Sequence, residues 1–255
     1  MENKGTGENV RSIERALNIL LCFNWECTEL TMTEIALKMN LAKSTTSRLI
    51  VTLENLGFLK KDKNNQYTLG YNVYNLGRIA KGNIDLLEIS RPTLVEVSKK
   101  TQETVILYTV HKGERLCLDN VESPLVIKRT VKNGEIFPLW EGASGRCLLA
   151  NLDETLWVKM AKKLKRVTEN TISDPDEFFN ELKKILKVGY AVSYGESDGE
   201  VACISAPIFN RDKKLMACLS ISGPRFRFPE NEENFVKLAK QGALNISKQL
   251  GYIEE

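Results

Sequence analysis

The forty residues from Thr31 to Gly70 constrain this chain most, because helix, turn and hairpin signals follow one another there with no room for long loops. A short helix is expected first, since three apolar residues recur at helical spacing: Ile35, Ala36 and Met39. Thr31 or Thr33 can cap its N-terminus, and Asn40 can adopt the left-handed conformation that ends a helix.

A second helix is expected from Leu41 to Gly57, and its two faces differ in chemistry. One face has apolar residues at helical spacing, with Thr46 one turn earlier: Leu49, Ile50, Leu53 and Leu56. The other face has hydroxyl and basic side chains: Lys43, Ser44, Thr45, Ser47, Arg48 and Thr52. Serine and threonine are indifferent helix formers, because their hydroxyls compete for backbone groups. Helix stability therefore does not explain why they gather here.

A basic hairpin and an earlier helix complete this region. Residues 58–70 place apolar pairs on either side of a tip that contains Lys60, Lys61 and Lys63, which is typical of a short β-hairpin. Residues 11–23 form another apolar stripe, with Ser12 as an expected N-cap. Three helices followed by a hairpin describe a winged helix-turn-helix.

The charge of the chain supports a nucleic-acid partner for this region. The net charge is +3, and residues 1–82 hold all of it, with eleven basic and eight acidic side chains. A helix fits the major groove of DNA, short hydroxyls donate to phosphate, and Lys43 and Arg48 displace counterions. The predicted partner is double-stranded operator DNA, and the candidate contacts are Thr33, Lys43, Ser44, Thr45, Ser47, Arg48, Thr52, Lys60, Lys61 and Lys63. The alternative is a polar face that meets only water.

The remaining two-thirds of the chain predict an α+β domain. Strands are expected at 104–110, 115–121, 125–131, 189–195, 201–210 and 215–223. Helices are expected over 71–82, over 85–100 with a kink at Pro92, from Ala143, from Asp153, from Asp174 to Gly189, and over 229–251. These elements predict an antiparallel sheet with flanking helices, and the chain divides into a tail (1–10), a winged helix-turn-helix (11–70), a joining helix (71–83) and a C-terminal domain (84–255).

Motifs at both ends of the chain resemble the IclR family of transcriptional regulators. They are TMTEIALKMNLAKSTTSRLIVTLENLGFLKKDKNNQYTLG, GEIFPLWEGASGRCLLA, and GYAVSYGE with CISAPIFN and LMACLSISGP. The chain departs from the family pattern at Asn40, where glycine is usual, and at Ala42, where proline is usual. The resemblance spans about residues 10–252. It implies a GAF-like effector domain, a linker helix used in dimerisation, and a homodimer, pairing into a homotetramer, on a palindromic operator.

Several polar residues of the C-terminal domain are candidates for an effector site. A helix that starts at Ala143–Gly145 exposes unpaired N–H groups to an anion. Ser220 and Ser222 share one face of a strand, as do Cys203 and Ser205. The resemblance implies that the ligand, a small organic acid, is lined by positions matching Ala143, Gly145, Cys203, Ser220 and Ser222. The full candidate set is Trp140, Ala143, Ser144, Gly145, Ser193, Cys203, Ser205, Ser220 and Ser222.

Three points about this candidate site stay open. The serines can instead satisfy backbone groups at a sheet edge, and Trp140 can line the ligand site or pack in the core. An acidic residue of some relatives falls here on Ser193 or Tyr194, and Gly199-Glu200 is shifted against a usual glycine, so a different ligand is expected. A benzoate-type acid and an aliphatic acid are equally compatible with the sequence.

Other classes of protein are less compatible with the sequence. Six scattered cysteines, no CxxC pair and the single histidine His111 do not predict a metal site, and no cofactor is expected. A Cys203–His111 catalytic pair is disfavoured because His111 begins a hairpin turn, and SGPRFR is too short for the nucleotide loop of a ligase. A winged-helix protein-contact module with a metabolite-binding domain stays an alternative. No apolar run or signal-like start occurs, so no membrane association is expected. The prediction is a cytoplasmic, ligand-responsive repressor or activator.

Overall fold

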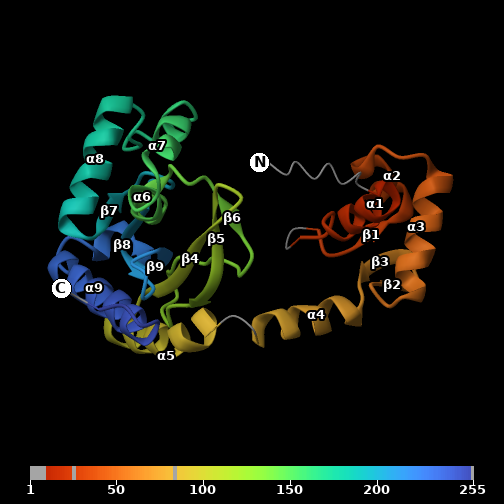
Figure 1. The fold of residues 1–255 in the computed structure, drawn as a ribbon, viewed down its shortest axis with the longest axis horizontal. Coiled ribbons are helices and arrows are strands. Elements are labelled where there is room, and N and C mark those ends of the chain that lie inside the picture. The colour runs from red at the N-terminus through yellow and green to blue at the C-terminus, as the bar shows by residue number, and fades with distance from the viewer. Residues whose placement is uncertain (1–9, 25–26, 83–84, 254–255) are drawn as a thin grey trace, which may run out of the picture. The chain divides into compact units, whose positions relative to one another are not determined.

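The chain contains two compact units, divided between Ile84 and Asp85. The computed structural model describes residues 10–24, 27–82 and 85–253, and Figure 1 shows their secondary structure. Each unit is described by itself below.

The N-terminal unit is a helix-turn-helix with a small antiparallel sheet (Figure 1). Its helices are α1 (Arg11–Leu20), α2 (Met32–Met39), α3 (Lys43–Asn55) and α4 (Tyr71–Gly82). Its strands lie in the order β1 (Leu30–Thr31), β3 (Gln66–Leu69), β2 (Leu59–Lys61). The predicted winged helix-turn-helix is confirmed, with β2 and β3 forming the wing.

Local signals fix the turn between α2 and α3. Thr31 caps α2, because its hydroxyl accepts from the Glu34 N–H at 3.3 Å while the Glu34 carboxylate accepts from the Thr31 N–H at 2.7 Å. Asn40 has φ 49° and ψ 49°, the left-handed conformation that the sequence predicts there. Gly57, at φ +68°, follows the end of α3 in the same way.

Some predicted boundaries in this unit are wrong. Val10, not Ser12, is the N-cap of α1, and no side chain caps it; α1 also ends at Leu20 rather than residue 23. Helix α3 begins at Lys43 instead of Leu41, because Ala42 has extended φ and ψ. The two-residue strand β1, paired with β3 at Leu30↔Tyr67, is too short to be seen in a periodicity.

The helices and the wing share one apolar core. It consists of Ile19, Phe23, Leu30, Ile35, Ile50, Leu53, Leu59 and Tyr67. Thr46 points into the unit, as predicted, and its hydroxyl donates to the Ala42 carbonyl at 3.2 Å. Leu56, predicted to continue the stripe, is 56% exposed because α3 ends one residue before it.

The C-terminal unit is built on a six-stranded antiparallel sheet (Figure 1). The strand order is β6 (Ile136–Phe137), β5 (Glu114–Val121), β4 (Thr104–His111), β9 (Leu215–Pro224), β8 (Val201–Phe209), β7 (Ala191–Tyr194). Helices α5 (Asp85–Thr101) and α9 (Glu232–Gln249) cover one face. Helix α6 (Gly142–Ala150) covers the other, and α7 (Glu154–Ala161) and α8 (Pro175–Val188) pack against α6. The predicted α+β class is confirmed.

Two predictions about this unit are wrong. Residues 125–131 form no strand, because side chains take up their carbonyls: Thr104 donates to Arg129 O and Asn120 to Val131 O. Helix α5 contains Pro92 without a break, since residues buried on both sides of the proline hold the helix on the sheet. Helix α9 begins at Glu232, after a short 3-10 turn over Arg225–Arg227.

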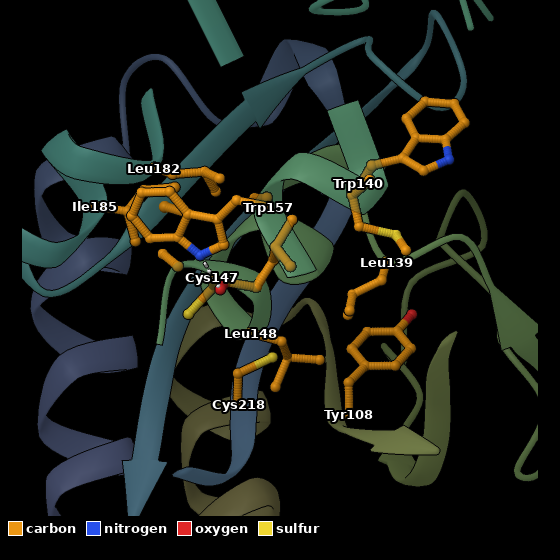
Figure 2. Close-up of a cluster of buried hydrophobic side chains, with 14 of the residues drawn as sticks. Tyr108, Leu139, Trp140, Cys147, Leu148, Trp157, Leu182, Ile185 and Cys218 are labelled. Carbon is orange, nitrogen blue, oxygen red and sulfur yellow. Dashed lines mark hydrogen bonds between the residues drawn. The ribbon is translucent and has the colours of Figure 1, made fainter. Parts of the chain in front are cut away.

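The two faces of the sheet bury different cores. Leu107, Ile204 and Leu219 pack against α5 and α9, whereas their neighbours on alternate positions face α6. Figure 2 shows the α6 side, where Trp157 lies with Leu182 and Ile185 and its Nε1 donates to the Leu149 carbonyl at 2.8 Å. In the residues described, no helix is both long and apolar enough to span a bilayer.

Candidate functional site

The outer face of α3 is the first candidate site, and its side chains lie where the sequence places them. Lys43, Ser44, Arg48 and Thr52 are exposed, Thr45 and Ser47 are half-buried, and Thr33 is exposed on α2. The hydroxyls of Ser44, Thr45 and Ser47 make no hydrogen bond within the described part of the chain, whereas Thr52 donates to the Arg48 carbonyl at 2.9 Å. Three hydroxyls are therefore free to bind another molecule.

The N-terminal end of α3 is open to an anion. Ala42 occupies the N-cap and offers no side-chain acceptor. The first intrahelical bond is from Thr46 N to Ala42 O, at 3.0 Å, so the N–H groups of Lys43, Ser44 and Thr45 have no helical acceptor. These N–H groups, the helix dipole and the Lys43 side chain together favour a phosphate at this end.

The wing presents basic side chains without acidic partners. Asp62, the one acidic residue of the hairpin, accepts from the N–H groups of Asn64 at 2.9 Å and Gln66 at 2.7 Å, so its carboxylate holds the turn. Lys60, Lys61 and Lys63 are exposed, and none forms an ion pair with another described residue. The α3 face and the wing are thus both cationic surfaces.

Helix α6, the second candidate site, passes through the interior of the C-terminal unit. All nine of its residues are buried, including the predicted Ala143, Ser144 and Gly145. A Cβ at Gly145 would lie 2.6 Å from the Leu139 carbonyl oxygen, so only glycine fits at this approach. Glu141 is the N-cap but supplies no side-chain hydrogen bond, and the first-turn N–H groups of α6 have no helical acceptor.

The structure brings the predicted serines and Cys203 together on the face of the sheet that α6 covers. Ser193, Cys203 and Ser222 lie in register across β7, β8 and β9, and Ser205 lies opposite Ser220. Strand β9 is central, so the sheet-edge alternative is wrong, although Ser222 does donate to a backbone carbonyl, that of Ala202, at 3.1 Å.

A continuous set of side-chain contacts, which we call the interior polar chain, links this face to α6. The Ser205 and Ser220 hydroxyls are 2.8 Å apart, and Cys203 Sγ lies 3.5 Å from Ser205 Oγ. Cys218 Sγ lies 3.6 Å from Ser220 Oγ and 3.7 Å from the Ser144 carbonyl. The members of the interior polar chain are Arg115, Ser144, Cys218, Ser220, Ser205 and Cys203.

Arg115 lies at one end of the interior polar chain, and the sequence did not predict it as a site residue. It is 6% exposed, donates through Nη1 to Ser144 Oγ, and lies over the rings of Tyr108 at 4.9 Å and Phe137 at 4.8 Å. The alternation of side chains along the strand could have predicted its burial, because Arg115 lies on the same strand face as the buried Cys117.

Two predicted residues lie beside other cavities. Ser193 lines a cavity of about 430 Å³ together with Arg146 and Glu196, which form a buried ion pair with Nη2 and Oε1 2.8 Å apart. Trp140 packs in the α6-side core and also lines a cavity of about 570 Å³, next to Lys162. In Figure 2 Trp140 lies on the opposite side of the cluster from Trp157.

The catalytic alternative does not fit the geometry. Cys203 lies in the same row as Thr104, and His111 is seven residues further along β4, about 23 Å away at the rise of a strand. Burial also raises the pKa of the Cys203 thiol, which disfavours a nucleophilic thiolate. No cluster of three metal-binding side chains occurs among the residues that the structure describes.

The comparisons with known proteins find matches for both units of the chain. The model of the IclR helix-turn-helix domain matches residues 12–63, and that of the bacterial transcriptional regulator IclR C-terminal domain matches residues 80–248. The chain is 30% identical to the HTH-type transcriptional regulator XynR of Escherichia coli, over 95% of this chain and 98% of that one. It is 29% identical to the regulator KipR of Bacillus subtilis, over 88% and 90%.

Solved structures show the same fold over nearly all of the chain. An IclR transcriptional regulator of Alicyclobacillus acidocaldarius superposes with a TM-score of 0.86 at 30% identity, covering 95% of this chain and 99% of that one. An IclR homologue of Microbacterium hydrocarbonoxydans, complexed with 4-hydroxybenzoate, shares the fold with a TM-score of 0.87 at 22% identity, covering 94% and 99%. The chain therefore belongs to the IclR family of bacterial transcriptional regulators.

Proposed function

We propose that the chain binds a palindromic operator through α3 and the wing, and that a small organic acid in the C-terminal unit changes its operator affinity. The observation that carries the first part is the outer face of α3. Among the residues described, the hydroxyls of Ser44, Thr45 and Ser47 have no partner, the N-terminus of α3 has no side-chain cap, and its cations form no ion pair, while Ile50 and Leu53 anchor the helix in the core. A helix that only faced water would not need this combination.

On this proposal the candidate residues have separate roles. Arg48 and the hydroxyls of Ser44, Thr45 and Ser47 reach base edges and phosphates in the major groove, with Lys43 and Thr52 beside them. Thr33, on α2, contacts the phosphate backbone of the DNA. Lys60, Lys61 and Lys63 lie along the phosphates or in the minor groove.

A homodimer, pairing into a homotetramer, supplies the symmetry that a palindrome requires. Helix α4 supports this, because it exposes large apolar side chains: Tyr71, Tyr74, Leu76 and Ile79. Exposed apolar residues on one short helix favour a partner helix. We place the regulator in the cytoplasm, where operator DNA is.

The effector part of the proposal rests on the interior polar chain. Ser205 and Ser220 are fully buried polar residues on the face of the sheet that α6 covers, and Cys218 links Ser220 to the Ser144 carbonyl. Ala143 and Gly145 flank Ser144 in the first turn of α6. The 4-hydroxybenzoate bound by the Microbacterium homologue shows that this fold accommodates a small organic acid. Binding there changes the packing of α6 and hence the operator affinity, a coupling between two sites.

Selection of DNA by the purified full-length chain tests the proposal. From a pool of random duplexes we expect enrichment of a palindromic sequence, whose affinity then changes when the effector acid is added. Retention of all duplexes without enrichment would favour general basic binding, and failure to retain DNA would favour the protein-contact alternative.

A further inference from the structure

The two buried arginines of the C-terminal unit are in opposite electrostatic situations. Arg146, 1% exposed, is paired with the Glu196 carboxylate. Arg115, 6% exposed, has no acidic partner within 4 Å among the residues described, and its Nε is buried without any hydrogen-bond acceptor. Burying an ionised side chain away from water is costly unless an opposite charge is paired with it. Arg115 therefore lacks the anionic partner that its burial calls for.

The acidic residues near Arg115 along the strands are engaged elsewhere. Asp119 pairs with Arg91, with Nη1 and Oδ1 2.9 Å apart. Glu135 accepts from the Lys132 N–H at 2.9 Å, and Glu114 is exposed on the opposite face of β5. Glu141, the half-buried N-cap of α6, makes no side-chain hydrogen bond at that helix end and no ion pair with Arg115. Among the residues described, no acidic side chain therefore lies within ion-pair distance of Arg115.

What surrounds Arg115 fits the anionic end of a small organic molecule. Its guanidinium lies over the rings of Tyr108 and Phe137, which contact each other edge to face, and it reaches the first turn of α6 through Ser144. The uncapped end of α6 adds a second positive feature at the same place. The Tyr108 hydroxyl makes no hydrogen bond with the described residues, and burial raises the pKa of Tyr108, so it stays a neutral donor. In Figure 2 it points toward Leu139, away from Cys218.

We propose that Arg115 binds the carboxylate of the effector, and that the hydrocarbon part of the effector lies against Tyr108 and Phe137. The inference rests on the proposed effector function, and it narrows the class of effector to monocarboxylic acids with an apolar body. An arginine pairs with a carboxylate through two parallel N–H groups, and Arg115 still has Nε and Nη2 to offer. The serines of the interior polar chain then orient the acid but do not neutralise it.

The experiment compares acids with their uncharged amides on the full-length chain. The probes are sodium benzoate, sodium 4-hydroxybenzoate and sodium butyrate, each beside its primary amide, with binding measured by calorimetry and by the melting temperature. The variants are Arg115→Met and, as a matched control, Arg91→Met, which removes an arginine of the same domain outside the site. At least one acid is expected to bind the wild type, its amide to bind far more weakly, and Arg115→Met to raise the Kd of the acid at least about tenfold. Arg91→Met keeps the wild-type Kd.

The ligand-free proteins supply a second readout that needs no effector. Methionine has the length of the arginine stem without the charge, so Arg115→Met is expected to melt no lower than the wild type, because an unpaired buried charge is lost. Equal affinity of Arg115→Met and wild type for the acid, amides as good as acids, or failure of all three acids to bind the wild type would each overturn the proposal. If the Arg115 proposal fails but a compound still changes the operator affinity of the wild type, the proposed effector function stands. If no compound changes the operator affinity of the wild type, the effector function fails as well.

Discussion

Replacing Arg146 by methionine tests the main polar anchor of α6. The substitution leaves the Glu196 carboxylate buried, 7% exposed, without its guanidinium partner. Breaking a buried pair by removing one member costs about 3–5 kcal/mol. Within a unit of the size of Asp85–Glu255, 1 kcal/mol shifts the melting temperature by about 2–4 °C, so a fall of roughly 6–20 °C is expected for this unit.

The structure also says how the loss can be recovered. Arg146 Nη2 donates to the Val192 carbonyl at 3.1 Å, but its Nε is buried without a partner, so the pair is not fully satisfied. Replacing both charges, as in Arg146→Met with Glu196→Leu, is therefore expected to restore most of the stability. The double variant separates the cost of an orphaned carboxylate from that of lost packing.

Urea denaturation followed by tryptophan fluorescence measures this effect. In a Trp25→Phe background, Trp140 and Trp157 report on the C-terminal unit. The control is Lys100→Met, which breaks the exposed pair of Lys100 Nζ with Glu96 Oε1, 2.6 Å apart, and is expected to cost less than about 0.5 kcal/mol. A cost for Arg146→Met as small as that of the control would refute the reasoning.

Three further predictions address the effector face, pH dependence and the helix-turn-helix. Ser220→Ala removes the 2.8 Å contact with Ser205 and is expected to impair the effector response while apo operator affinity is unchanged; a normal response in the same titration would exclude a role for this hydroxyl. Burial raises the pKa of the Cys117 thiol to about 12 from 9.0, so the native state is expected to lose stability as the pH rises from 9 toward 12, when only the unfolded chain deprotonates; a urea midpoint that stays flat over this range would contradict it. Thr31→Ala removes the α2 cap and is expected to destabilise the N-terminal unit by about 1 kcal/mol, seen in its own melting transition; no change would mean that the capping box adds nothing.

The winged helix-turn-helix was predictable because its signals are local. Thr31, Asn40 and Gly57 each mark a boundary by their own backbone chemistry, and the stripe ending at Leu53 fixes which face of α3 is buried. The predicted inward turn of Thr46 followed from the same spacing. The errors were at the ends of helices such as α1, where a missing side-chain cap leaves no signal, and at the two-residue strand β1, which was not predicted.

The interior of the C-terminal unit was only partly predictable, because pairing between distant strands decides it. Alternation places Ser220 and Ser222 on one face, but only the sheet order brings Ser205 opposite Ser220. The surroundings of Arg115 could not be predicted either, because its guanidinium lies over Tyr108 and Phe137, which belong to the two strands on either side of its own. The segment around Val126, 98% exposed, is rich in strand-forming residues, yet side-chain donors hold its backbone off the sheet.

The affinity of Arg48→Ala for a selected operator tests the central claim most directly. Fluorescence anisotropy at one fixed salt concentration compares the wild type, Arg48→Ala and the charge-matched control Lys183→Ala, an exposed residue of α8. The account predicts a loss of about 1–3 kcal/mol for Arg48→Ala, roughly a five- to 150-fold rise in Kd, with Lys183→Ala unchanged. Equal operator affinity of Arg48→Ala and the wild type would contradict the placement of α3 on DNA.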